Sequence, residues 1–290
     1  MKNYINIPGW ISNYCTNRRA AKGSIWVEIM HHSTLCMLSL LTCCLALPLP
    51  REAGKMNKQE WGKAQEYLKN FYSYDPEARI HNLEDKIKAM QKFFGLEQTG
   101  ILNTNTMEII QKPRCGVPDM GEYSFFPGRP KWHSKVVTYR ISSYTEDLPH
   151  STVDKLVEKA FDMWSEVSKL TFKKVNTRHA DIVIDFPKRV HWDYQPFDGP
   201  GGTLAHAFAP GEGLGGDAHF DKEELWSDGR TVGINFLWVA THEFGHSLGL
   251  AHSSDPDAVM YPTYGTKNPM DFSLSEDDIR GIQKLYGIRK

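Results

Sequence analysis

Residues 242–252 constrain this chain more than any other feature. They read His-Glu-Phe-Gly-His-Ser-Leu-Gly-Leu-Ala-His. On a helix, His242 and His246 lie four residues apart, so both imidazoles project from the same face. Gly249 allows the backbone to turn sharply out of the helix and bring His252 back beside the other two. Three imidazoles that leave a fourth position open are typical of a catalytic zinc site.

Glu243 follows the first of these histidines and is directed into the same cleft, where it is expected to take a proton from a metal-bound water. Downstream, residues 259–262 read Val-Met-Tyr-Pro and match a methionine turn. The two motifs together resemble those of the metzincin metalloproteases. The alternative is an ordinary buried helix whose histidines align by chance. The length of the motif and its downstream partner argue against that alternative.

The length and net charge of the chain limit its number of domains and its classes of partner only loosely. Its 290 residues are enough for one or two domains. The formal net charge of -1 gives no reason to expect a nucleic acid partner. No stretch reaches the roughly 20 consecutive apolar residues that a membrane span requires.

Residues 33–47 form a short apolar run that is typical of a secretory signal peptide, with Cys44 and Ala46 at the -3 and -1 positions of the cut. The run lies unusually far from Met1, and a start at Met30 would give a more usual length. A buried core helix is the alternative. Cleavage after Ala46 would leave Cys115 as the only one of the five cysteines, so no internal disulfide is expected.

The remaining chain divides into two units. Helical spacing predicts helices over residues 56–73, 83–94 and 105–111. Two prolines and a glycine in residues 113–119 then disfavour regular structure. In the second unit, strands are expected over 135–141, 171–175 and 180–186, with two short strands inside the loop-rich stretch 191–220. Helices are expected over 153–170, over 232–250 and after a cap at Ser275.

The loop-rich stretch carries side chains that favour metal ions. His191, Asp193, His206 and His219 would form a closed structural zinc site. Acidic side chains nearby, together with glycine carbonyls, offer the hard oxygen ligands that calcium prefers; they are Asp181, Asp198, Asp217, Asp221 and Glu224. A polar, solvated loop is the alternative reading of the same composition.

From residue 47 to residue 290 the chain resembles the matrix metalloproteinases. The resemblance rests on Pro-Arg-Cys-Gly-Val-Pro-Asp at 113–119, the zinc motif, the methionine turn and Pro-Phe-Asp-Gly at 196–199. It implies an α+β fold, in which a three-helix propeptide precedes a catalytic domain with a twisted, mostly parallel five-stranded sheet and three helices. The implied domains are a leader (1–46), a propeptide (47–122) and a catalytic domain (123–290) without a hemopexin-like domain.

The same resemblance implies a secreted zinc endopeptidase of the extracellular space and matrix. It would be a monomer that cleaves matrix and cell-surface proteins and binds tissue inhibitors of metalloproteinases. Cys115 would occupy the fourth zinc position in the zymogen, with Arg114 and Asp119 paired to shape its loop. Activation would cut between Glu122 and Tyr123, and the new ammonium group of Tyr123 could pair with Asp277.

Two zinc ions and two or more calcium ions are implied. One calcium would take Asp198, Gly199, Gly201, Thr203, Asp221 and Glu224, and another Asp181, Gly213, Gly215 and Asp217. A third would use Asp147, but Lys222 stands where the family supplies an acidic residue. Trp192 replaces a glycine of close relatives, and Trp238 replaces a tyrosine at the wall of the S1′ substrate pocket.

Two other functions are alternatives to a matrix metalloproteinase. Another metzincin protease, an astacin or an adamalysin, is disfavoured by the segment around Cys115 and by the lack of disulfides. A non-catalytic binding module stabilised by zinc and calcium is disfavoured by Glu243, which a purely structural site does not need.

Overall fold

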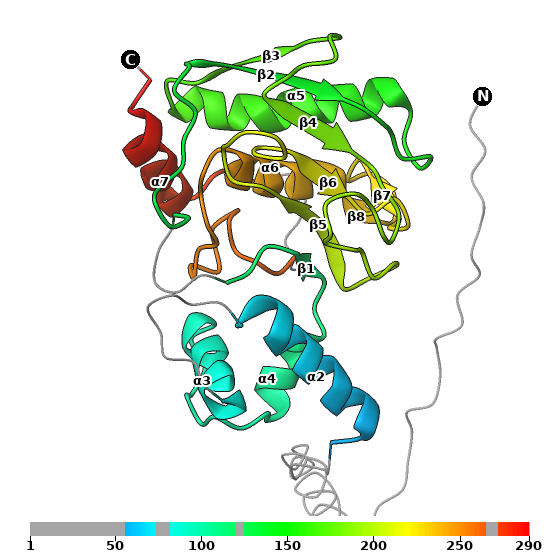
Figure 1. Cartoon of the computed structure of the whole chain (residues 1–290), viewed down its shortest axis with the longest axis vertical. Helices are drawn as coiled ribbons and strands as arrows, with labels where there is room; N and C mark the ends of the chain where they lie inside the picture. Colours follow the sequence, from blue (N-terminus) through cyan, green and yellow to red (C-terminus); the bar gives the residue numbers. More distant parts are fainter. Residues whose placement is uncertain (1–55, 74–81, 120–124, 265–271, 290) are drawn as a thin grey trace, which may run out of the picture. The chain divides into compact units, whose positions relative to one another are not determined.

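The computed structural model describes residues 56–73, 82–119, 125–264 and 272–289 (Figure 1). The predicted leader and the predicted Glu122–Tyr123 cut lie outside the described residues. Within the described ranges, no helix combines the length and the apolar character that a bilayer crossing requires.

Three helices form the N-terminal unit, as predicted: α2 (Lys58–Phe71), α3 (Leu83–Phe93) and α4 (Thr104–Ile110). Each is preceded by an asparagine whose side chain accepts a hydrogen bond from the third helical residue, which satisfies an otherwise unpaired amide. Their apolar faces form a core of their own, made of Tyr67, Leu68, Phe71, Tyr72, Ile87, Met90 and Phe93. Trp61 of α2 lies outside this core and is 41% exposed.

The second unit is built on a six-stranded sheet in the order β1-β5-β6-β4-β2-β3. All neighbours are parallel except β5 and β6. Five strands come from the predicted catalytic region: β2 (Val136–Ile141), β3 (Thr171–Lys174), β4 (Ile182–Asp185), β5 (Thr203–Ala207) and β6 (Ala218–Phe220). The five-stranded sheet expected from the sequence is therefore present, with one strand added.

The added strand is β1 (Arg114–Cys115), which pairs in parallel with β5 at the edge of the sheet. The prediction that residues 113–119 lack regular structure was wrong for these two residues. The reason is tertiary: an unpaired edge strand offers free backbone groups that an extended segment can pair with.

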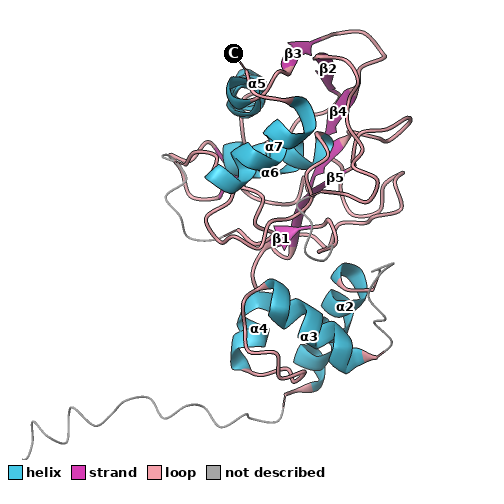
Figure 2. Ribbon diagram, turned by 90° about the vertical axis from the view of Figure 1, so that its left-hand side faces the viewer, coloured by secondary structure: helices cyan, strands magenta, loops and turns pink. Residues whose placement is uncertain are grey.

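Helices α5 (His150–Val167), α6 (Phe236–Ser247) and α7 (Glu276–Tyr286) lie on one side of the sheet, and long loops cover the other side (Figure 2). The largest core lies between sheet and helices, and its fully buried members include Trp164, Phe161, Phe220 and Phe244. Helix α6, which carries the zinc motif, is therefore held along its length by packed side chains.

Helix α6 begins at Phe236 and not at residue 232, as the sequence predicted. Ile234 and Asn235 instead form the short strand β8 (Ile234–Asn235), which pairs with β7 (Trp226–Ser227). The side chain of Asn235 accepts a hydrogen bond from Leu237 N and starts the helix there. The local cap and the strand pairing thus set the start of the helix.

Helix α7 begins at the predicted Ser275 cap, and Asp278 completes a capping box with it. The Asp278 carboxylate also accepts hydrogen bonds from Val259 N (2.8 Å) and Met260 N (3.1 Å). Helix α7 therefore holds the methionine turn in place beneath α6.

Candidate active site and metal centres

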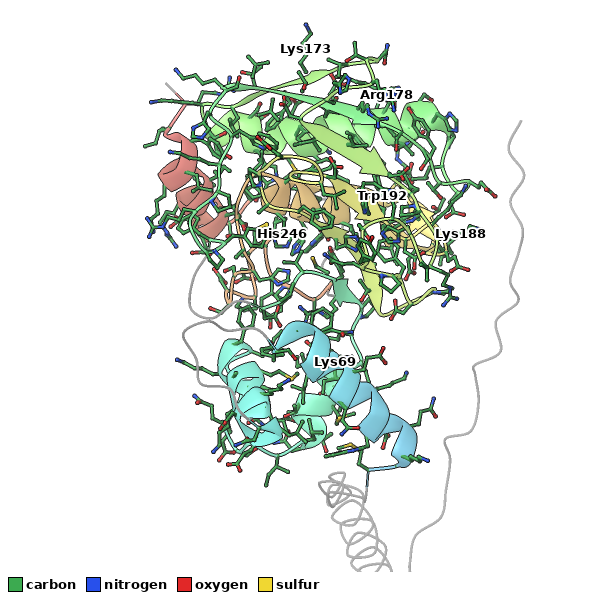
Figure 3. The ribbon with its side chains drawn as sticks, in the orientation of Figure 1. Lys69, Lys173, Arg178, Lys188, Trp192 and His246 are labelled. Carbon is green, nitrogen blue, oxygen red and sulfur yellow. The ribbon has the colours of Figure 1, made fainter. Side chains whose placement is uncertain are left out.

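The three histidines of the zinc motif are buried close together. His242 and His246 come from α6, and His252 comes from the segment after the turn at Gly249, whose φ of +99° favours glycine. Figure 3 labels His246, which lies in the interior of the molecule. With Cys115, these residues form a group whose four ligand atoms all lie within 4.8 Å of one another.

The imidazole orientations fit a common metal ion. His242 Nδ1 lies 2.7 Å from Val259 O and His246 Nδ1 lies 2.8 Å from Leu250 O, which leaves both Nε2 atoms for the centre. His252 Nε2 is buried without a hydrogen-bond partner, a costly arrangement for a polar atom that has no ligand. Bonds of the lengths zinc makes would place ligand atoms about 3.3–3.6 Å apart. The observed separation of 3.1 Å between His246 Nε2 and His242 Nε2 is close to that.

The protonation states also fit a metal. Burial lowers the pKa of His242 and His246 well below the usual value, and the nearby His252 lowers both further. Burial likewise lowers the pKa of His252, against an opposing effect of Asp119. These shifts favour the neutral imidazole, which is the form that binds zinc.

Cys115 reaches this group from the sheet edge. Its Sγ lies 3.4 Å from His246 Nε2 and 3.6 Å from Glu243 Oε2. The backbone holds it there, because Cys115 N donates to Pro262 O at 2.9 Å and Gly116 N donates to Ala205 O at 2.8 Å. Burial and the negative charge of Glu243 raise the pKa of the thiol. The cysteine side chain is thus the fourth member of a possible tetrahedral ligand set.

The loop around Cys115 is shaped by a buried ion pair, as the resemblance implied. Arg114 Nη2 lies 2.7 Å from Asp119 Oδ1, and the Arg114 Nη1 atom lies 3.1 Å from Asp119 Oδ2. The guanidinium also stacks on Phe71, with 3.6 Å between its central carbon and the ring centroid. Asp119 N donates to Phe71 O at 3.2 Å. Helix α2 therefore contacts the loop directly.

Glu243 is fully buried beside the histidines. Burial raises its pKa to about 8, while hydrogen bonds with Cys115 and Tyr264 act in the opposite direction. Tyr264 Oη donates to Glu243 Oε1 at 3.2 Å. No sequence spacing points to Tyr264, because its position relative to Glu243 depends on how the segment after the methionine turn folds back.

His191, Asp193, His206 and His219 form a second group, from the loop before β5 and from strands β5 and β6. Asp193 Oδ2 lies 2.9 Å from His191 Nε2, 2.7 Å from His206 Nε2 and 2.7 Å from His219 Nδ1. Burial lowers the pKa of His206, and lowers that of His219 to about 4. Four nitrogen and oxygen ligands of this kind fit a closed zinc site.

The carboxylates expected to bind calcium lie farther from one another than the ligand atoms of the two histidine groups do. Among the residues that the structure describes, the two histidine groups are the ones in which three or more ligand atoms come within 4.8 Å. Asp198 Oδ1 accepts from Thr203 N, Asp221 Oδ2 from Gly199 N, and Glu224 Oε1 from Gly201 N. Burial, together with the charges of Asp221 and Asp198, raises the pKa of Glu224 to about 7. A cation would relieve this repulsion.

The two carboxylates of the second expected calcium site accept hydrogen bonds from neighbouring strands and not from glycine amides. Asp181 Oδ2 accepts from both Thr138 N and Thr138 Oγ1 at 2.7 Å. Asp217 Oδ1 accepts from Val183 N at 2.8 Å, and burial raises the pKa of Asp217 to about 6. Gly213 has a φ of +69°, a conformation that suits glycine.

Lys222 lies where the third calcium of the family would need an acidic residue. Its Nζ is 3.0 Å from Glu146 Oε1. Asp147, the other expected ligand, accepts a hydrogen bond from Trp226 N at 3.0 Å. A bound cation at this position would face the charge of Lys222.

Comparisons with known proteins agree with this geometry. The sequence model of the matrixin family matches residues 131–287. The chain is 64% identical to human (Homo sapiens) matrilysin over 261 residues, which cover 90% of this chain and 98% of that protein. It is 59% identical to mouse (Mus musculus) matrilysin over 90% of this chain and 99% of that protein. Horse (Equus caballus) stromelysin-1 is 47% identical over 89% of this chain and 55% of its own length.

The chain belongs to the matrixin family. It is therefore a zinc-dependent metalloendopeptidase with a propeptide. The sequence model of a peptidoglycan binding domain matches residues 57–110, the stretch that holds α2, α3 and α4.

In this matrixin, Trp192 lies on the loop that also supplies His191 and Asp193 (Figure 3). Its ring contacts His219 edge-on, with 5.0 Å between centroids, and the side chain remains 54% exposed. The indole thus lies beside the histidine group, with about half of the side chain exposed.

Trp238 lies one turn before His242 on α6 and is half-buried. Its ring packs against Phe272, with 5.1 Å between centroids and 31° between planes. Phe272 is the first described residue after 265–271. The indole therefore has a packing partner outside its own helix.

Proposed function

We propose that this matrixin is a secreted cysteine-switch zymogen that hydrolyses extracellular matrix and cell-surface proteins, with Glu243 as the general base. The convergence of Cys115, His242, His246 and His252 beside the buried Glu243 carries this proposal. The zinc motif, the segment around Cys115 and the identity to human matrilysin support it.

Glu243 would do the proton chemistry. A zinc ion held by the three histidines would supply an acidified water and polarise the scissile carbonyl. The Glu243 carboxylate would accept a proton from that water and hand it to the leaving amine. Tyr264 Oη would hold the carboxylate in position.

The segment around Cys115 indicates where a substrate would bind. Arg114 N donates to Gly202 O at 2.8 Å and Gly116 N donates to Ala205 O at 2.8 Å, along the edge of β5. On the other side, Tyr264 N donates to Pro113 O at 3.0 Å. When the propeptide leaves, these groups become free to pair with the backbone of an extended substrate.

The remaining assignments rest on the family resemblance and on the geometry above. We assign a structural zinc to His191, Asp193, His206 and His219. We assign one calcium to Asp198, Gly199, Gly201, Thr203, Asp221 and Glu224, and another to Asp181, Gly213, Gly215 and Asp217. We infer a monomer in the extracellular space that tissue inhibitors of metalloproteinases bind.

The proposed domains are a leader (1–46), a propeptide (47–122) and a catalytic domain (123–290). The two separate hydrophobic cores support a division between the helical unit and the sheet unit. Activation would cut between Glu122 and Tyr123 and let the new N-terminus pair with Asp277. In the zymogen, Asp277 Oδ2 accepts from Ser253 Oγ at 2.8 Å. N-terminal sequencing of the active form tests the cut, and unchanged activity of Asp277→Asn would exclude a role for the pairing.

The decisive experiment is Glu243→Ala, compared with Glu166→Ala at an exposed position of α5. The active-site variant should retain both zinc ions and lose at least about 10²-fold in peptide hydrolysis, because the proton acceptor is gone while the histidines remain. The control should keep wild-type turnover. Near-normal hydrolysis by Glu243→Ala would overturn the mechanism.

A further inference from the structure

The Nδ1 atoms of the three zinc-motif histidines do not all face the same kind of hydrogen-bond acceptor. His242 and His246 each face a backbone carbonyl of the sheet unit, Val259 O at 2.7 Å and Leu250 O at 2.8 Å. His252 Nδ1 instead lies 2.8 Å from Asp119 Oδ1. Asp119 precedes the expected activation cut, so the third histidine is oriented by a residue that activation removes.

Asp119 is held firmly in this place. It is buried, with Arg114 against both carboxylate oxygens. The hydroxyl of Tyr72 donates to Asp119 Oδ2 as well.

Arg114 and Tyr72 both donate to the Asp119 carboxylate, which therefore serves as an acceptor, and His252 Nδ1 at 2.8 Å is placed to donate to it. The lone pair then lies on His252 Nε2, the buried atom that has no hydrogen-bond partner and belongs to the ligand group. A carboxylate behind a metal-binding histidine fixes its tautomer and ring orientation and makes it a better ligand.

We propose that Asp119 is a positioning residue for the metal site, through which the propeptide strengthens zinc binding by way of His252. This proposal rests on the proposed function, in which His242, His246 and His252 hold the catalytic zinc. It predicts that the zymogen retains this zinc more tightly than the mature enzyme does, for a reason separate from Cys115.

The separation from Cys115 is testable because Asp119 has two contacts. Through Arg114 it shapes the loop that presents the thiol, and through His252 it touches the ligand set directly. In a proenzyme that lacks the thiol, the first effect can no longer change zinc binding, whereas the second remains.

The experiment measures zinc release to a chromogenic chelator from full-length proenzyme that carries Glu243→Ala, which prevents autolysis, and Cys115→Ala. The same protein with His246→Ala added serves as the reference. The kinetic phase of zinc release that disappears in this reference is assigned to the site on α6. Adding Asp119→Asn should speed that phase by about 10-fold, the lower end for loss of such a partner. Release from the second histidine group should not change.

Two controls test whether faster zinc release reflects a general destabilisation of the propeptide contact and not the loss of the Asp119 carboxylate. Tyr72→Phe removes the hydroxyl on Asp119 Oδ2 without removing the acceptor of His252, so release should stay within about twofold of the parent. Mature protein, prepared from the same parent by an added protease and freed of the propeptide, lacks Asp119 without any substitution there. It should release zinc as fast as the Asp119→Asn proenzyme.

Equal release rates for the parent and Asp119→Asn would overturn the proposal, as would an equal acceleration by Tyr72→Phe. Failure of the proposed function would look different. If metal analysis of the parent finds no zinc that depends on His246, the assignment of the catalytic site itself is wrong.

Discussion

Gly245, inside the zinc motif on α6, lies in direct contact with Met260 of the methionine turn. A Cβ placed on Gly245 would lie 2.2 Å from Met260 Sδ and 3.0 Å from Trp164 Cζ2. Both neighbours are buried, so neither can move away freely. The glycine at this position is what allows the methionine turn to approach α6.

Gly245→Ala should therefore destabilise the protein by about 1–3 kcal/mol, the cost of overpacking a tight core. Urea unfolding measures the change. The matched control is Gly62→Ala in α2, where nothing lies within 4 Å of the new methyl group. That control should be neutral or stabilising by about 0.5–1 kcal/mol, because alanine is the better helix former. Equal behaviour of the two variants would show that the contact is not tight in solution.

Cys115→Ser should make the uncleaved proenzyme active. A hydroxyl binds zinc far more weakly than a thiolate, so water can take the fourth position. The measurement is hydrolysis of a short peptide at early times, with gel analysis to establish that the chain is still intact. Wild-type proenzyme and chelator-treated variant serve as controls. An intact but silent variant would mean that the propeptide blocks the cleft by its bulk.

Calcium should stabilise the protein more at pH 8 than at pH 5. Without the ion, burial and the nearby Asp221 and Asp198 raise the pKa of Glu224 to about 7. A carboxyl whose folded pKa is raised above its usual 4.5 favours folding at low pH, and this contribution is lost as pH rises through 7. Calcium would bind the ionised carboxylates and so restore the folding free energy that is lost at high pH.

Thermal unfolding with calcium or with a calcium chelator, at both pH values, measures this effect. Glu224→Gln does not titrate and should show a smaller pH dependence of the calcium effect. A calcium effect of the same size at both pH values would argue against Glu224 as a ligand.

Trp238 should make the S1′ pocket narrower than a tyrosine would. Tryptophan has the larger ring, and in a packed wall the extra volume has to be accommodated. If the indole points into the pocket, leucine and methionine should be preferred at P1′ over bulky aromatic residues, by about 1–3 kcal/mol at most. The packing of Trp238 on Phe272 offers the other outcome, in which the indole turns away and the pocket stays deep.

A P1′ peptide library compares the wild type with Trp238→Ala and with the conservative Trp238→Tyr. Relaxed selectivity should be greatest for the alanine variant and intermediate for the tyrosine variant. Cleavage of P1′ Phe or Trp by the wild type as readily as Leu would rule out the narrow pocket.

The sequence by itself determined the parts of this protein whose geometry is local. Histidines four residues apart on a helix share a face whatever surrounds them, so His242 and His246 could be predicted as partners. Asn57, Asn82 and Ser275 cap their own helices, and a cap needs only the next three residues. The metal-binding side chains of the loop-rich stretch indicated the second histidine group, and the family resemblance added the role of Cys115.

The tertiary structure alone decided which distant groups meet. Spacing could not place Asp119 against His252, Tyr264 against Glu243, or Asp278 against the methionine turn. It also could not show that Arg114 and Cys115 add a strand to β5, or that β8 delays the start of α6. These contacts depend on how separate elements pack, and the free energy of packing belongs to the whole core and not to any one segment.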